Sequence, residues 1–204
     1  MLLRNVFRRS STVNSAREGL VQQIEAIIAA QKPLKPSKVA GVHEKGWRWT
    51  ESKDSTRIVV ERWTGATRVN LLFYARPGTL ASARAAKQPK PSVPFLLLVE
   101  PGRARSLLGE GRLGGLSFAL NALYLVDKAD GDRFLDDPAR LLRESVARGP
   151  NLVHLRPALE TRILAYLEAL GVEEELSAFA EAKSYRHEQV LYRRWLHDLR
   201  LFAM

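Results

Sequence analysis

The sequence predicts an α+β fold built on an antiparallel sheet, with one helix before the sheet and two helices after it. Residues 17–31 have the apolar spacing of an amphipathic helix, and residues 156–202 return to that spacing. Between them, residues 41–127 read as successive strands without an intervening helix, which favours antiparallel pairing. The chain has 204 residues and is 46% hydrophobic, so it is long enough to bury a sizeable core.

The predicted N-terminal helix is identified by apolar residues that share one face. They recur every three or four positions, at Leu20, Ile24, Ile27 and Ile28. Pro33 and Pro36 follow within the segment KPLKPSK. Because proline cannot continue a helix, we expect the helix to end before them.

The predicted strands alternate in polarity or form short apolar runs bounded by turn residues. Trp47 and Trp49 are two positions apart and therefore lie on one face of a strand. A hairpin tip is expected at Gly65-Ala66, between TRIVVERW and RVNLLFYA. Residues 81–91 are polar and basic and are expected to form a loop. Two further strands, VPFLLLVEP and LSFALNALYLV, are expected on either side of a glycine-rich loop.

The C-terminal part of the chain is predicted to be mainly helical. A short helix is expected to begin at Asp136-Asp137-Pro138, where an acidic cap precedes a proline, and residues 143–150 are expected to return to an extended edge. A first long helix spans about residues 156–170 and ends at Gly171, and a second runs from about 173 to 202. The first is expected to bury Leu159, Ile163, Tyr166, Leu167 and Leu170.

The composition excludes several classes of protein and site. No run of 18 uncharged apolar residues occurs, so we expect no membrane insertion. Cysteine is absent, which excludes disulfides and thiolate metal sites, and the four histidines are scattered. Glu173-Glu174-Glu175 are adjacent on a predicted helix, where they point in different directions and suit the positive end of the helix dipole. We therefore predict no catalytic residue, no metal and no cofactor.

One glycine motif raises the alternative of a small-molecule enzyme. Residues 109–114 match GxGxxG, with Asp130 or Asp132 near the spacing of a dinucleotide-binding acid. In that motif the glycines must follow a strand directly and open a helix, so that the pyrophosphate meets the helix N-terminus. Here eight residues separate Glu100 from the motif, and a predicted strand follows it. We therefore expect a flexible loop and no small-molecule substrate.

The net charge of +10 is confined to the first half of the chain. Residues 1–100 hold 17 basic and 7 acidic residues, whereas residues 101–204 hold 15 of each. Residues 1–17 contain four arginines, no acid and several hydroxyl side chains, a composition typical of a mitochondrial transit peptide. The alternative is a basic RNA-binding arm. We expect a transit peptide at residues 1–17 and a single domain over residues 18–204.

Basic residues elsewhere form the candidate binding surface. Arg48, Arg57, Arg62 and Arg68 lie on predicted strands, and the predicted loops 81–90 and 102–114 hold Arg84, Lys87, Lys90, Arg103, Arg105 and Arg112. Such residues either form a solvated face or contact phosphates or an acidic protein. The nearby aromatic residues lack the pattern of known RNA-recognition modules, so any RNA contact is expected to be mainly to the backbone.

The C-terminal segment resembles a known family. Gly149-Pro150 leads into LETRILAYLEALGV, and the last helix ends with Tyr192, Trp195, Leu199 and Phe202. These four recur every three or four residues and are predicted to form one buried face. In order and spacing over about 55 residues, the segment resembles the mitochondrial acidic matrix protein family, also called the mitochondrial glycoprotein family. A protein that binds the globular heads of complement is a relative within that family.

The resemblance implies a strongly twisted antiparallel sheet of about seven strands, with one N-terminal and two C-terminal helices packed on it. It also implies a ring-shaped trimer of identical subunits or paralogues, a location in the mitochondrial matrix and no enzymatic activity. Family members act as adaptors or chaperones and are tied to mitochondrial translation, ribosome assembly and RNA processing. They are typically very acidic, whereas this chain is basic. The electrostatic field of this chain is therefore positive where that of the family is negative, which favours RNA or an acidic paralogue as the partner.

The expected function is therefore a non-catalytic scaffold of a mitochondrial ribonucleoprotein, involved in the ribosome, its assembly, or RNA processing or editing. The alternative is a free-standing matrix chaperone or adaptor that makes no RNA contact.

Overall fold

The computed structural model describes residues 2–31, 45–75, 92–114, 117–144, 146, 149 and 151–204. The chain divides into two compact units. One unit comprises Ser37–Glu188 and contains the sheet. The other comprises Met1–Pro36 together with Gln189–Met204 and consists of helices. The last helix of the chain continues from the first unit into the second.

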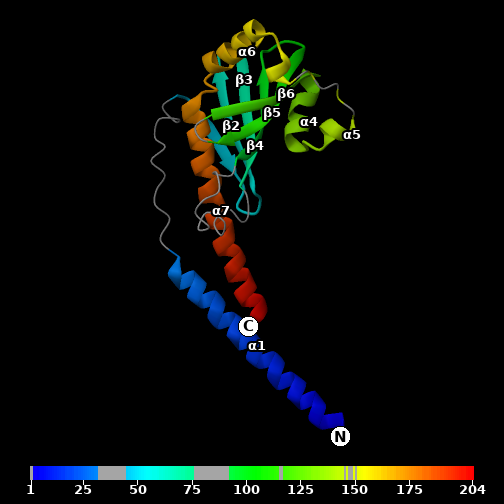
Figure 1. The fold of residues 1–204 in the computed structure, drawn as a ribbon, viewed down its shortest axis with the longest axis vertical. Helices are drawn as coiled ribbons and strands as arrows, with labels where there is room; N and C mark the ends of the chain where they lie inside the picture. Colours follow the sequence, from blue (N-terminus) through cyan, green and yellow to red (C-terminus); the bar gives the residue numbers. More distant parts are fainter. Residues whose placement is uncertain are drawn as a thin grey trace. The chain divides into compact units, whose positions relative to one another are not determined.

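The sheet is an antiparallel meander in which each strand pairs with the next along the chain (Figure 1). The described residues contain six strands, whereas about seven were expected. They are β1 Arg48–Glu51, β2 Arg57–Thr64, β3 Thr67–Tyr74, β4 Val93–Glu100, β5 Arg105–Gly114 and β6 Ser117–Asp127. The expected extended edge at residues 143–150 makes a backbone bond to β6, from Gly149 N to Leu123 O at 2.7 Å. A single bond of this kind does not make a strand.

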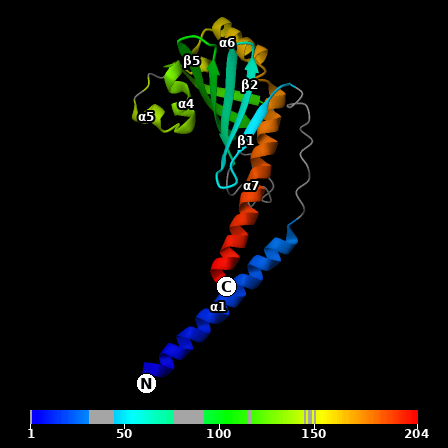
Figure 2. The ribbon, with the colours of Figure 1, turned by 180° about the vertical axis from the view of Figure 1, so that it is seen from behind.

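Both faces of the sheet are buried, each under its own helices (Figures 1 and 2). Alternate residues of β2 to β4 point to opposite faces because side chains alternate along a strand. One face packs against α6 Pro157–Ala169 and the first part of α7 Glu174–Ala203. The other packs against α4 Lys128–Asp136 and α5 Arg140–Arg143. The sheet is thus the middle layer of three.

The predicted short helix after Asp136-Asp137-Pro138 corresponds to α5, whose first turn is closed by bonds from Arg140 N to Asp137 O and from Leu141 N to Pro138 O, but the sequence analysis missed the helix before it. Helix α4 begins directly after β6 and ends at Asp136, and Pro138 lies in the turn before α5. Gly131 in the middle of α4 hides the helix from sequence patterns, because glycine disfavours helix interiors. A Cβ at Gly131 would lie 3.2 Å from both Leu98 methyl groups, so glycine allows α4 to approach β4 closely.

The expected flexible loop at residues 109–114 is also wrong, because these residues form the end of strand β5. A Cβ at Gly111 would lie 2.2 Å from the carbonyl oxygen of Ala119 and 2.6 Å from the Phe95 ring. A Cβ at Gly109 would lie 2.9 Å from Leu120. These two glycines allow neighbouring strands and side chains to approach closely, and no helix follows them to receive a pyrophosphate.

The two C-terminal helices are confirmed, and so is the helix end at Gly171, which has φ +85°. Gly171 N donates to Glu168 O at 2.7 Å, and Val172 N donates to Leu167 O at 2.9 Å. This pair of bonds is the Schellman motif that satisfies the last carbonyl groups of a helix. Among the residues predicted to be buried on α6, Leu167 and Leu170 are buried, whereas Leu159 and Tyr166 are about half exposed.

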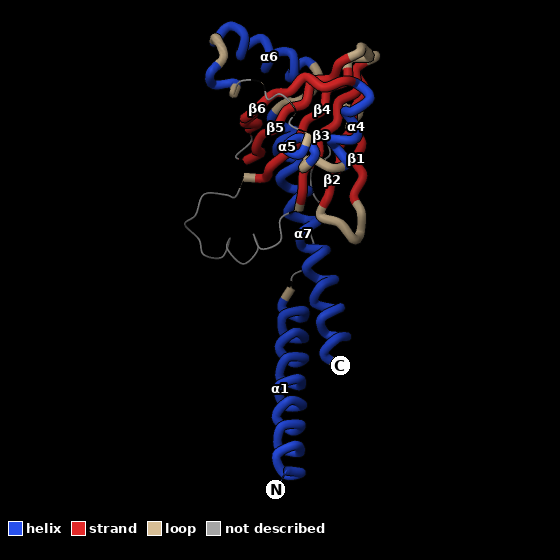
Figure 3. The backbone as a smooth tube through the Cα atoms, turned by 90° about the vertical axis from the view of Figure 1, so that its right-hand side faces the viewer, coloured by secondary structure: helices blue, strands red, loops and turns tan. Residues whose placement is uncertain are grey.

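The second unit pairs α1 Leu2–Ala30 with the end of α7 in antiparallel orientation (Figure 3). Arg193 Nε donates to Gln31 Oε1 at 2.8 Å, and Arg200 Nε lies 3.0 Å from Glu25 Oε1. Arg17 donates to the carbonyl oxygen of Ala203. The predicted N-terminal helix is thus confirmed, and it begins earlier than the amphipathic pattern indicated.

Replacing Gly111 with alanine should destabilise the sheet. The new Cβ would collide with a backbone oxygen, which cannot move without distorting β6, and overpacking of this kind costs about 3 kcal/mol. We expect the melting temperature to fall by about 6–12 °C in a thermal unfolding experiment. Gly114→Ala is the matched control, because its Cβ would meet Ser92 at an ordinary 3.5 Å. Equal melting temperatures for the two variants would contradict this account.

Candidate binding surfaces

The strand arginines predicted to contact RNA do not form one surface. Register pairs Arg48 with Glu61 and Trp63 with Arg68, which places these four residues on the face that α4 covers in part. Arg62 is offset by one residue and lies on the opposite face. The alternation of strand side chains therefore divides these arginines between the two faces of the sheet.

Arg68 is the centre of an ion-pair network. Its guanidinium lies 2.9 Å from Glu100 Oε2 and 3.6 Å from Glu61 Oε2, and it donates to Asp132. The amide oxygen of buried Asn70 fits as an acceptor from Arg68 Nε at 2.7 Å. The Glu100 side chain is 8% exposed, and burial raises the pKa of its carboxyl while the charge of Arg68 opposes that rise. Arg68 therefore neutralises carboxylates of its own chain.

The network borders an open pocket of about 600 Å³ at the same end of the sheet. The residues that line it are Trp63, Ala66, Arg68, Glu100, Gly102, Lys128, Ala129 and Asp132. Trp63 is 60% exposed there. Because the pocket holds two basic and two acidic side chains, its charges balance, and phosphate binding is not favoured over cation binding.

Arg62 has a packing role. Its guanidinium carbon lies 5.8 Å from the centre of the Trp47 ring, and the guanidinium covers Gly171 at the end of α6. Trp47 itself is 1% exposed. A cation over a buried indole ring is stabilised by the ring quadrupole, so this arginine supports the turn between α6 and α7.

Arg57, also predicted, donates to Asp136 at 2.8 Å. The other described arginines of the predicted set stay accessible, although two of them are not in loops as expected. Arg103 lies in the turn between β4 and β5, whereas Arg105 and Arg112 lie near opposite ends of strand β5. Arg105 is 66% exposed and lies 3.8 Å from Asp127, and Arg112 donates to Ser92 Oγ. Arg48 is exposed on the short edge strand β1. Arg84, Lys87 and Lys90 lie outside the described residues.

The aromatic stripe of α7 faces solvent in this chain. Tyr192, Trp195 and Phe202 are 38%, 54% and 82% exposed, and Leu199 is partly buried. The prediction of one buried face is therefore wrong for the single chain. Leu196 and Ala203 are buried instead, about one position away around the helix. Tyr192 and Trp195 stack on each other with ring centres 6.0 Å apart.

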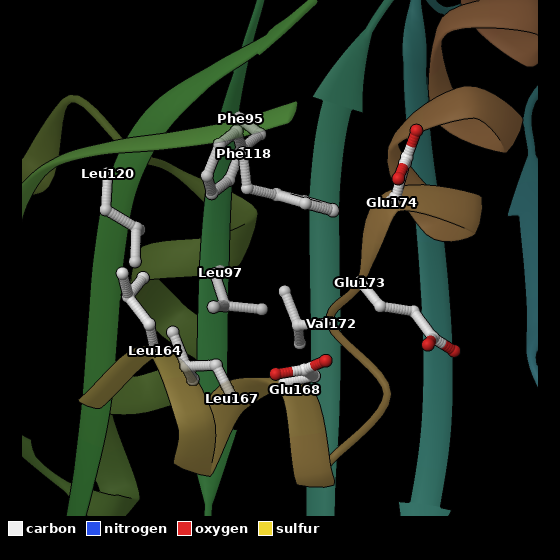
Figure 4. Close-up of a pocket in the computed structure, with 10 residues that line it drawn as sticks. All are labelled: Phe95, Leu97, Phe118, Leu120, Leu164, Leu167, Glu168, Val172, Glu173 and Glu174. Atoms are coloured by element: carbon white, nitrogen blue, oxygen red, sulfur yellow. The ribbon is translucent and has the colours of Figure 1, made fainter. Parts of the chain in front are cut away.

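An apolar pocket that the sequence did not predict lies between the sheet and α6 (Figure 4). Its volume is about 220 Å³. Strands β4 and β6 supply Phe95, Leu97, Phe118 and Leu120, and α6 and the following turn supply Leu164, Leu167 and Val172. Glu168, Glu173 and Glu174 complete the lining.

Two local features build this pocket. Register pairs Glu110 with Ala122 and Gly111 with Leu120, so Asn121 is the extra residue of a β-bulge. The bulge changes the alternation of β6, which places Leu120 on the α6 face and Ala122 on the α4 face. The Schellman motif at Gly171 holds Leu167 and Val172 together on the other side.

Polar side chains hold the first part of α7 to the β1–β2 hairpin. Lys183 Nζ lies 3.0 Å from Glu51 Oε2 and 4.8 Å from the centre of the Trp49 ring. His187 is buried, and its Nε2 lies 2.7 Å from the carbonyl oxygen of Ser55. This histidine has the structural role of satisfying a backbone group.

Other kinds of site were sought across the residues that the structure describes. Among them, no group of three or more histidine and carboxylate side chains is arranged to hold a metal ion. Within the same residues, none of the helices has the length and hydrophobicity needed to cross a bilayer.

Replacing Arg68 with methionine should destabilise the protein in a pH-dependent manner. At pH 7 the Glu100 carboxylate would be left partly buried without its cation, at a cost of about 2–3 kcal/mol. A carboxyl with a raised pKa takes up its proton more readily when folded than when unfolded, so stability is recovered as the pH falls through that pKa and is lost as it rises. Urea unfolding of the variant should therefore show a smaller deficit at pH 5 than at pH 7.

The control for this prediction is Arg105→Met, which removes an exposed arginine whose partner Asp127 is also exposed. Such a pair contributes less than about 1 kcal/mol at either pH. A deficit in Arg68→Met that did not change with pH would show that poorer packing, rather than an unpaired carboxylate, causes it.

Two comparisons place the chain among known proteins. The family model of the mitochondrial glycoproteins matches residues 23–203. A hypothetical protein of Leishmania major, described as a sequence homologue of human p32, is 18% identical, with a TM-score of 0.73 over 93% of this chain and 99% of its own. The p22 protein of Trypanosoma brucei is 20% identical, with a TM-score of 0.71 over 93% of this chain and 100% of its own. The chain belongs to the mitochondrial glycoprotein family.

Proposed function

We propose that this protein is a non-catalytic, oligomeric scaffold of the mitochondrial matrix that associates with a mitochondrial ribonucleoprotein. The observation that carries the proposal is the exposed aromatic stripe on α7. Membership of a mitochondrial family with self-associating members supports the location and the assembly. The arginine-rich residues 1–17 support import as a transit peptide.

The helical unit leaves several large apolar side chains exposed to solvent, and a stable monomer would be expected to bury them. Outside the proposed transit peptide, these are Leu20 on α1 and Val190, Tyr192, Trp195, Leu201 and Phe202 on α7. Exposed aromatic side chains close together on one helix, such as Tyr192, Trp195 and Phe202, mark a protein contact site, because their exposure to water is unfavourable. A ring of three subunits, identical or paralogous, would cover them.

RNA contact would fall on the basic side chains that remain exposed to solvent. Arg48, Arg103, Arg105 and Arg112 are exposed, and Arg84, Lys87 and Lys90 add to the basic charge of the sequence. Arg68 and Arg62 contribute less, because one is bound to carboxylates and the other covers an indole ring. A trimer would present each arginine three times, which multiplies weak phosphate interactions.

The second candidate is a free-standing matrix chaperone or adaptor without RNA contact. The observation that favours it is the internal neutralisation of Arg68, which removes one of the strand arginines expected to bind phosphate. Sedimentation of the tagged protein in mitochondrial lysate separates the two candidates. A ribonucleoprotein component sediments with a large particle that ribonuclease disperses, whereas a free chaperone sediments as the small ring with or without ribonuclease.

Replacing Trp195 with glutamate should dissociate the oligomer, because three carboxylates would have to be buried where three indole rings meet the neighbouring subunits. Size-exclusion chromatography with light scattering should give a trimer for the wild type and a smaller species for the variant. Trp63→Glu is the matched control, since Trp63 is similarly exposed but lies on the sheet. A monomeric wild type, or a trimeric Trp195→Glu variant, would contradict the proposed interface.

Replacing Arg103 and Arg105 with glutamine should weaken RNA binding by reducing counterion release. Anisotropy with a labelled oligouridylate should show log affinity falling steeply with log salt for the wild type. The slope should be shallower in the double variant by about 0.7 for each phosphate that is no longer neutralised. Arg133→Gln is the control, because this exposed arginine is paired with Asp130 at 2.7 Å. A flat salt dependence of the wild type would exclude the RNA contact.

A further inference from the structure

The apolar pocket beneath α6 has the size of a site for one large side chain. An apolar cavity of about 150 Å³ holds a benzene molecule, and this pocket measures about 220 Å³. Phe95, Leu97 and Leu167 form its buried wall, and Leu164 at its edge is 41% exposed, so the pocket opens to solvent. Phe95 and Phe118 meet edge to face, with ring centres 5.3 Å apart. The apolar lining is suited to an aromatic ring or a leucine-sized side chain.

The charge around the pocket has one sign. All three charged residues that line it are glutamates (Figure 4). Lys45 lies 2.7 Å from the Glu173 carboxylate and compensates that residue. Among the residues that the structure describes, Glu168 and Glu174 have no ion-pair partner. The border of the pocket is therefore acidic on a chain whose net charge is +10.

Glu168 is placed where it does not stabilise its own helix. It lies in the last turn of α6, and the C-terminal end of a helix carries partial negative charge that repels a carboxylate. The last turn of α6 contains no basic residue to offset it. Glu174, in contrast, lies in the first turn of α7, where a carboxylate is favourable. Glu168 is thus an exposed carboxylate whose charge is not offset by its own helix, and a cationic ligand would offset it.

We propose that this pocket binds one aromatic or leucine-sized side chain of a basic peptide segment of a partner protein. The side chain enters between α6 and strands β4 and β6, and arginines or lysines that flank it pair with Glu168 and Glu174. The proposal goes beyond the scaffold function because it names a second ligand class, a basic protein segment, and it does not require RNA contact. The apolar interior and the acidic border of the pocket together favour this ligand over a nucleic acid, because the carboxylates repel phosphate groups.

The probe is a labelled peptide of alternating alanine and arginine with one central phenylalanine, titrated into the full-length protein. Fluorescence anisotropy should show binding about tenfold to a hundredfold tighter than for the same peptide with central alanine, because the benzyl group leaves water. A peptide with glutamines in place of the arginines should also bind more weakly. Methyl NMR should place the phenylalanine contact at Leu164, Leu167 and Val172.

The test variant is Glu168→Gln with Glu174→Gln, which removes two carboxylates at exposed positions. We expect affinity for the phenylalanine peptide to fall about tenfold, as for the removal of two charge-assisted hydrogen bonds at an exposed site. The control is Asp127→Asn with Asp136→Asn, which removes two exposed carboxylates away from the pocket lining. Glu168→Gln alone should leave the melting temperature unchanged or slightly higher, since it removes a charge that the helix dipole disfavours.

Equal affinity for the phenylalanine and alanine peptides would show that only surface charge is involved and would overturn the proposal. An equal decrease of affinity in the test and control variants would overturn it as well, and so would the absence of binding by a correctly folded protein. None of these outcomes bears on the oligomer, which light scattering measures separately.

Discussion

The fold depends on burying both faces of a sheet whose central strands carry large apolar side chains on each face. Strands β3 and β4 place leucine, valine and phenylalanine on both sides, so a single layer of helices would leave one face in water. Helices α6 and α7 cover one face, and α4 and α5 cover the other. The close approach of these layers explains Gly131 on α4, and the close strand packing explains Gly111 on β5. The same constraint forces polar groups near the core to find partners within the chain.

Those internal partners decide how much of the positive charge is available for binding. Arg68 is bound to carboxylates, Arg62 covers Trp47, and Lys183 is paired with Glu51. The basic composition therefore overstates the positive electrostatic field around the sheet, because some of the basic side chains are bound to groups of their own chain. The accessible arginines lie mainly at turns and strand ends, where a partner can reach them. Phosphate contact would occur there, while the acidic border of the pocket would attract a ligand of opposite charge.

Helix α7 combines two roles along one continuous segment. Its first part packs on the sheet through Leu176 and Phe179, and Lys183 and His187 make polar contacts with the β1–β2 hairpin. Its last part pairs with α1 and directs Trp195 and Phe202 into solvent. An aromatic pair left in water on an ordered helix is unfavourable unless another surface covers it. The exposed stripe therefore links the fold of one chain to the assembly that we propose.

The sequence by itself determined the antiparallel order of the strands, the helices at both ends, the helix end at Gly171 and the family. These follow from local periodicity, turn residues and motif order, which act over neighbouring residues. It could not reveal α4, because Gly131 conceals the helix and only its contact with Leu98 explains the glycine. The sequence pattern placed the aromatic residues of α7 in the interior. An apolar stripe on a helix has the same spacing whether it packs against its own chain or against another subunit. The pocket was decided by tertiary structure alone: the bulge at Asn121 and the turn at Gly171 are far apart in sequence, and only packing brings Leu120 and Val172 to one cavity.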